Sequence, residues 1–180
     1  MRAPFLAQQM APLPEARVSL GYAFETVELD CFGPLYVGVG RGQAVKHYGV
    51  IFTCLKTCAV HLELVEKLST SSFTDALMRF RARRGDPREI YSDNGTNFTG
   101  ASKEIRQWVQ EWDQEELGAA VRPWGVTWHF NPAEASHRGG VFESLIRPCR
   151  RILESISSDF IPSREVMVTL LAEVERTMNN

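Results

Sequence analysis

Three stretches in the first third of the chain carry dense apolar residues of the kind found in β-strands. They cover about residues 24–31, 48–55 and 58–65, and each is rich in Val, Ile, Phe, Thr and Leu. Runs of this length and composition favour strands over helices. The sequence therefore predicts three strands before the first helix.

A helical period begins after the third run. The buried face of this predicted helix consists of Phe73, Ala76, Leu77 and Phe80. Hydroxyl side chains at 69–72 offer N-caps, and Gly85 and Pro87 are stop signals. Further along, the pattern predicts strands at about 89–92 and 126–130 and helices at about 101–117, 139–157 and 163–178. The whole is typical of an α/β domain with five strands.

Three acidic residues fall at the ends of predicted elements. Asp93 follows a short β-type run directly before a turn, and Asp30 ends another strand-like run. Glu143 lies just inside a helix that opens with Gly139-Gly140. Carboxylates from three elements that meet at one point are the ligand set of a two-metal phosphoryl-transfer site.

Each acid also has an ordinary structural explanation. Asp93 followed by Asn94 and Gly95 is common turn chemistry. Glu143 with Arg147 is an i,i+4 ion pair, and Asp30 can cap a loop at Gly33-Pro34. Position alone does not decide between these alternatives.

The surrounding residues resemble a known family. The matching segments run in family order and are Asp30-Cys31-Phe32-Gly33-Pro34, Tyr48-Gly49-Val50-Ile51-Phe52-Thr53-Cys54-Leu55, Ala59-Val60-His61-Leu62-Glu63, Arg83-Arg84-Gly85-Asp86-Pro87, Tyr91-Ser92-Asp93-Asn94-Gly95-Thr96-Asn97-Phe98, Phe130-Asn131-Pro132 and His137-Arg138-Gly139-Gly140-Val141-Phe142-Glu143. They resemble the catalytic core of retroelement integrases, the D,D,E family, and most closely the BEL/Pao retrotransposon lineage.

The resemblance implies an RNase H-like fold, with a five-stranded mixed sheet flanked by helices, and a nuclear or cytoplasmic DNA-integrating enzyme. It implies that Asp30, Asp93 and Glu143 are catalytic and hold two Mg²⁺ or Mn²⁺ ions. Between Asp93 and Glu143 lie 49 residues, more than in retroviral cores. The extra length falls in 108–138, which the BEL/Pao pattern accommodates.

The resemblance also implies DNA contacts around the last acid. The residues at the matching positions are Asn131, His137, Arg138, Arg147 and Arg150. Arginine suits this role because its planar fork can bind two phosphate oxygens. For His137, an exposed loop position or a helix N-cap remains an equally good explanation.

The charge balance argues against strong DNA binding by the chain alone. Lys and Arg number 20 against 22 Asp and Glu, which gives a net charge of -2. Arginines do cluster at 79–84 and at 147–151, either as a local basic face or as solvated helix surface. Cys54 lies inside the second predicted strand and Cys58 opens the third, and together with His61 they offer only three zinc ligands, so we favour no zinc site.

At 180 residues the chain fits one domain. We expect residues 1–20 to be a Pro-rich linker and residues 21–180 to be the catalytic core, cut from a longer polyprotein at its C-terminus. No stretch reads as a signal peptide or membrane span.

We expect a homodimer or higher oligomer, paired through a surface around Trp108, Val109, Trp112 and the last helix.

Two other functions share parts of this pattern. A ribonuclease H has the same fold and metals but lacks the segment Asp93-Asn94-Gly95-Thr96-Asn97-Phe98. A domesticated, catalytically silent integrase domain would keep the fold as a DNA- or protein-binding module. The three acids, all present, favour the enzyme.

Overall fold

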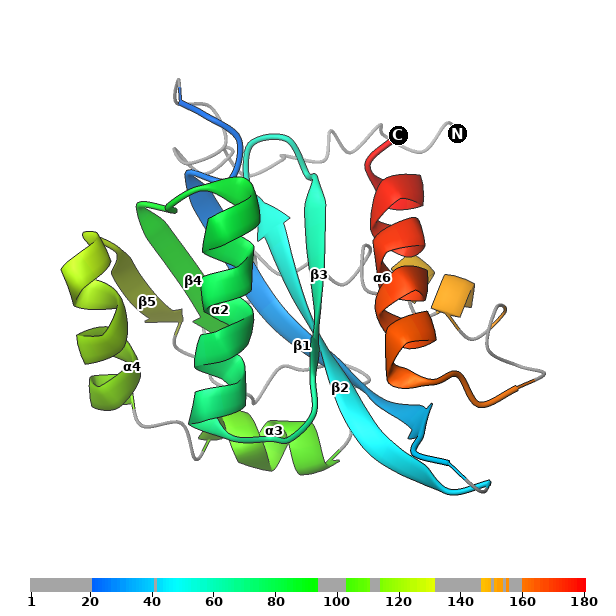
Figure 1. The fold of residues 1–180 in the computed structure, drawn as a ribbon. Helices are drawn as coiled ribbons and strands as arrows, with labels where there is room; N and C mark the ends of the chain where they lie inside the picture. The colour runs from blue at the N-terminus through cyan, green and yellow to red at the C-terminus, as the bar shows by residue number, and fades with distance from the viewer. Residues whose placement is uncertain are drawn as a thin grey trace, which may run out of the picture.

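A computed structural model describes residues 21–40, 42–93, 103–110, 114–131, 147–149, 151–153, 155 and 160–180. Its strands are β1 (Thr26–Gly38), β2 (Ala44–Cys54), β3 (Val60–Val65), β4 (Glu89–Asp93) and β5 (Thr127–Asn131). They form one five-stranded sheet in the order β3-β2-β1-β4-β5 (Figure 1). The prediction of three strands before the first helix is confirmed.

The sheet is mixed. β1, β2 and β3 pair antiparallel, whereas β1, β4 and β5 run parallel. β4 therefore returns to the sheet beside β1, with α2 (Thr70–Arg84) as the crossover that a parallel connection requires. The predicted α/β class, with a mixed sheet flanked by helices, is confirmed.

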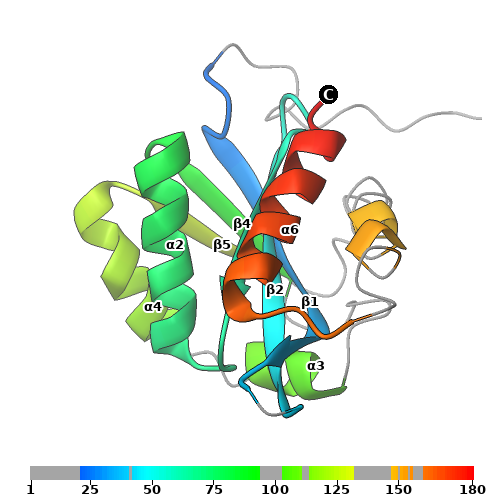
Figure 2. The ribbon, with the colours of Figure 1, turned by 45° about the vertical axis from the view of Figure 1, so that its right-hand side comes forward.

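Helices cover both faces of the sheet. α2 and α4 (Gln114–Val121) lie on one face, and α6 (Arg164–Met178) lies on the other, as Figure 2 shows. Both long helices have serine N-caps: Ser69 accepts a hydrogen bond from the Ser72 N–H, and Ser163 accepts one from the Val166 N–H. Of the helices that the structure describes, none has the length and apolar character to cross a membrane.

Two apolar cores lie against the two faces. The first packs α2, α3 (Lys103–Gln110) and α4 against residues such as Val27, Leu29 and Phe52. The second packs α6 and the helical residues 147–149 and 151–153 against Phe32 and Ile51. Alternate residues of β1 thus enter different cores, which fixes the face to which each β1 position belongs.

Two predicted elements differ from the structure. In place of a single helix at 101–117, the described residues form α3 and α4, while 111–113 lie outside them. β1 is also longer than predicted and continues to Gly38. The predicted linker, residues 1–20, lies outside the described residues.

Candidate active site

Asp30 and Asp93 occupy neighbouring positions on two parallel strands. The register between β1 and β4 pairs Leu29 with Ser92, and the two aspartates come next on their strands. Leu29 and Ile90 belong to the first core, so alternation assigns the positions of Asp30 and Asp93 to the opposite face. The sheet therefore brings the two main-chain positions side by side, as the sequence predicts.

The expectation that Asp30 ends a strand is wrong. Asp30 is the fifth residue of β1, which has 13 residues. Pairing with β2 continues past it, through a register shift between Phe32 and Leu35, whereas pairing with β4 stops at Leu29. Asp30 thus lies at the end of the pairing between β1 and β4, next to the end of β4 at Asp93.

The carboxylate of Asp30 is half-buried and held by the main chain. Its Oδ1 accepts a hydrogen bond from the backbone N–H of Cys31 at 2.6 Å. Burial, and then the Asp30 charge, raises the pKa of the Cys31 thiol well above its ordinary value. The raised pKa disfavours the thiolate form of Cys31, whose side chain packs in the first core.

Asn131 extends this row across a third strand. The register of β4 and β5 pairs Asp93 with Asn131. On its other side, Asp93 faces the β1 position that follows the Leu29–Ser92 pair, which is that of Asp30. The structure describes the main chain at Asp93 and Asn131. A predicted DNA-contacting position thus adjoins a predicted metal-binding position.

Sequence reasoning missed a polar cluster next to this row. Tyr91 and His129 lie two residues before Asp93 and Asn131, and their rings stack at 4.5 Å between centroids. The Tyr91 hydroxyl donates to Glu89 Oε2 at 3.1 Å, and His129 Nε2 lies 3.9 Å from Glu89 Oε1. The signal was present in the sequence, because positions two apart on a strand share a face.

The other predicted site residues are placed only in part. Arg147 is exposed in a helical segment whose Cys149 and Leu153 belong to the second core, on the Asp30 face of the sheet. Glu143, His137, Arg138 and Arg150 lie outside the described residues. Within the described part of the chain, no group of three metal-ligating side chains could hold a metal ion. The predicted triad includes Glu143 and so extends beyond that part.

The arginine cluster of α2 is engaged in ion pairs. Arg79 and Arg83 both contact Glu63 of β3, and Arg84 contacts Glu175 of α6. Arg81 pairs with Asp86 at 2.6 Å. Each arginine of this cluster therefore has an acidic partner, which weakens the prediction of a basic face for DNA at this position.

Trp108 is not available for the predicted dimer surface. Its side chain is 5% exposed and packs in the first core, where its ring meets Phe73 edge-on. The amphipathic helix α3 turns this residue inward, so that part of the prediction is wrong. The terminal helix α6 does expose Val166 and Val168.

Comparison with known proteins gives a fold and no family. No protein-family model matches the chain, and no curated protein matches it either. A chain in the cryo-electron microscopy structure of the simian T-cell lymphotropic virus intasome in complex with PP2A regulatory subunit B56 gamma matches with a TM-score of 0.58 and 14% identity. The fold is RNase H-like. The match covers 93% of this chain and 53% of the other, so this chain spans about half of that protein's length.

Proposed function

We propose that this chain is an integrase-type polynucleotidyl transferase that acts on DNA. The observation that carries the proposal is the placement of Asp30 and Asp93 at adjacent positions of parallel strands, on one face of an RNase H-like sheet. The similarity of fold to a chain of a retroviral intasome supports it. The resemblance of the surrounding segments to BEL/Pao integrases supports the more specific assignment.

The donor set fits magnesium or manganese. Asp30 and Asp93 offer carboxylate oxygens at neighbouring positions, and Glu143 is the proposed third ligand. A pair of bound Mg²⁺ or Mn²⁺ ions supplies Lewis-acid chemistry that activates the attacking hydroxyl and offsets charge on the phosphate. The Cys31 N–H orients the Asp30 carboxylate, so part of the ligand geometry is set by the fold.

Two displacements at phosphorus make up the proposed reaction. In the first, the oxygen of a water molecule bonds to phosphorus near the element's 3′ end, and the leaving 3′ oxygen takes up a proton. In the second, the oxygen of that 3′ hydroxyl loses its proton and bonds to a phosphorus of target DNA, and the displaced 3′ oxygen of the target takes up a proton. No covalent bond to the protein is needed, so the chain's own task is to hold and orient both DNA strands.

The basic and amide side chains near the acids would bind the DNA. We assign this role to Asn131, His137, Arg138, Arg147 and Arg150. Asn131 adjoins Asp93 in the β4–β5 register, and the exposed Arg147 lies on the same side of the sheet as Asp30. Nuclear or cytoplasmic action on element and target DNA, by a dimer or higher oligomer, follows from this assignment.

Nicking of supercoiled plasmid in Mn²⁺ tests the activity without knowledge of the element's end sequence. Asp30→Asn and Asp93→Asn should each slow nicking by about a hundredfold or more, because several kcal/mol of charge stabilisation is lost. Asp86→Asn is the matched control, since Asp86 is an exposed aspartate paired with Arg81. Nicking by Asp93→Asn at the wild-type rate would contradict the proposal. An inactive wild type that still binds Mn²⁺ would favour the catalytically silent module.

A further inference from the structure

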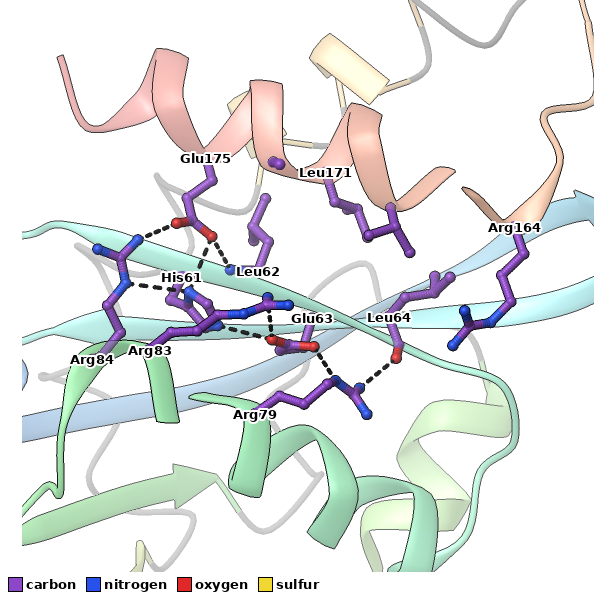
Figure 3. A pocket seen from close by; sticks show the side chains of 12 residues that line it. His61, Leu62, Glu63, Leu64, Arg79, Arg83, Arg84, Arg164, Leu171 and Glu175 are labelled. Atoms are coloured by element: carbon purple, nitrogen blue, oxygen red, sulfur yellow. Dashed lines mark hydrogen bonds and ion pairs between the residues drawn. The ribbon is translucent and has the colours of Figure 1, made fainter. Parts of the chain in front are cut away.

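A charged pocket opens at the edge of the sheet formed by β3, away from Asp30 and Asp93. It encloses about 550 Å³ and is lined by residues of β3, α2 and α6. Figure 3 shows three arginines of α2 reaching toward β3, with Glu175 and Arg164 coming from separate turns of α6. Its size is in the range of small-molecule sites.

The floor of the pocket is a closed network. His61 is buried between two carboxylates, with Nε2 3.0 Å from Glu63 Oε1 and Nδ1 3.1 Å from Glu175 Oε2. Glu175 Oε2 also accepts the N–H of Leu62, and Glu63 Oε2 accepts Arg79 Nε. The acidic groups are thus already satisfied by the protein, so they do not call for a bound cation.

The walls retain hydrogen-bond donors. Arg83 contacts Glu63 through Nη1, and Arg164 contacts Glu66 through Nε, while their side chains are 56% and 60% exposed. A guanidinium carries five N–H groups. Among the contacts of the described residues, each of these two arginines therefore uses only part of its fork.

The balance of charge favours an anion. Four arginines, at 79, 83, 84 and 164, line the pocket, against the three glutamates at 63, 66 and 175 that pair with them. The pocket thus has one positive charge in excess, whereas the chain as a whole carries -2. A local positive excess with unused forks is typical of phosphate recognition.

We propose that this pocket binds a small free ligand that bears phosphate groups. Phosphate suits it better than carboxylate, because a phosphate offers three oxygens to the arginines that line the pocket from α2 and α6. The site is separate from the proposed active site, since β2 lies between β3 and the β1 strand that carries Asp30. The two proposals can therefore fail independently.

Isothermal titration with pyrophosphate, in buffer with EDTA to exclude metal chelation, tests the proposal. The wild type should bind pyrophosphate saturably at one site. Arg83→Gln and Arg164→Gln should each weaken binding about tenfold, the loss expected for a hydrogen bond to a charged group. Because both side chains are more than half exposed, these variants should keep the wild-type unfolding midpoint.

Arg176→Gln is the matched control. Arg176 lies on the same helix as Arg164, is 66% exposed and pairs with a single glutamate, Glu173, but it does not line the pocket. It should bind pyrophosphate as the wild type does, and so should Asp93→Asn. No saturable binding at millimolar pyrophosphate, or an equal loss in Arg176→Gln, would overturn the proposal. Displacement of pyrophosphate by a short DNA duplex would also overturn it, since the ligand would then be nucleic acid.

Discussion

Replacement of His61 should destabilise the fold by an amount that depends on pH. The His61 side chain is 2% exposed and contacts Glu63 and Glu175 through its two ring nitrogens. Burial lowers the pKa of His61, but the hydrogen bonds with Glu175 and Glu63 outweigh it and raise the pKa above its ordinary value. The two carboxylates therefore favour the charged imidazolium over a wider pH range than that of an isolated histidine. Arg84 Nε also lies 3.3 Å from His61 Nδ1.

The sign of the pH dependence follows from these shifts. Because the pKa of His61 is raised on folding, its stabilisation is complete below about pH 6.5 and is lost as the pH rises through the folded-state value. For Glu63 and Glu175, burial opposes ionisation, yet hydrogen bonds led by that to His61 lower both pKa values. Their stabilisation is present above about pH 4.3 and is lost as the pH falls. The network should be strongest in mildly acidic solution.

The expected loss is moderate because both carboxylates keep other partners. Glu63 retains Arg79 and Arg83, and Glu175 retains Arg84, when His61 is removed. Hydrogen bonds to charged groups contribute about 1.5–3 kcal/mol each, and a glutamine amide can replace one of the two. We expect His61→Gln to cost about 2 kcal/mol near pH 6, or about 4–8 °C in midpoint for a domain of this size.

Thermal unfolding at about pH 6 and about pH 8.5 measures the effect. The destabilisation by His61→Gln should shrink at the higher pH, because wild-type His61 loses its charge as the pH rises through its folded-state pKa. Arg176→Gln, which removes an exposed positive charge of α6, controls for the change of net charge and should shift neither midpoint. An equal loss at both pH values would refute the charged state of His61.

Three further predictions concern packing, DNA affinity and assembly. Gly49→Ala should cost about 1–3 kcal/mol in urea unfolding, because the ring of Phe32 lies against Gly49 and leaves no room for a Cβ atom. Gly118→Ala in α4, where a Cβ meets nothing within 4 Å, should be neutral or stabilising, and the reverse order would contradict this packing. With a net charge of -2 and the arginines of α2 paired, duplex DNA should bind weakly with a shallow salt slope in fluorescence anisotropy; tight, strongly salt-dependent binding would contradict this. Sedimentation at micromolar concentration should show a dimer, and a strict monomer at high concentration would count against the assembly.

The sequence predicts most of the sheet for a simple physical reason. Every residue of β3 is buried, and four of its six residues are apolar, the exceptions being His61 and Glu63. A strand that is buried along its whole length favours such a run of apolar residues, which is visible in the sequence. The five-stranded mixed sheet came with the family resemblance, and the strand order and pairing bear it out. Local pattern and family order here point to the same arrangement.

Other features depend on contacts that no local pattern contains. Gly33-Pro34 reads as the end of a strand, yet β2 keeps β1 paired on both sides of it. The partnership of His61 with Glu175 joins a strand to a helix far along the chain. Alternation could have identified Tyr91 and His129, but nothing in the sequence shows that their rings stack across two strands.

A Mn²⁺ titration followed by thermal unfolding tests most directly the claim that Asp30 and Asp93 hold a metal ion. Carboxylates at adjacent positions repel each other without a cation, so binding should raise the midpoint. At a hundredfold excess over the dissociation constant the gain is about 2.7 kcal/mol, or about 5–10 °C. Asp30→Asn and Asp93→Asn should lose most of this shift, while Asp86→Asn keeps it. A shift of equal size in the wild type and in Asp93→Asn would contradict the metal site.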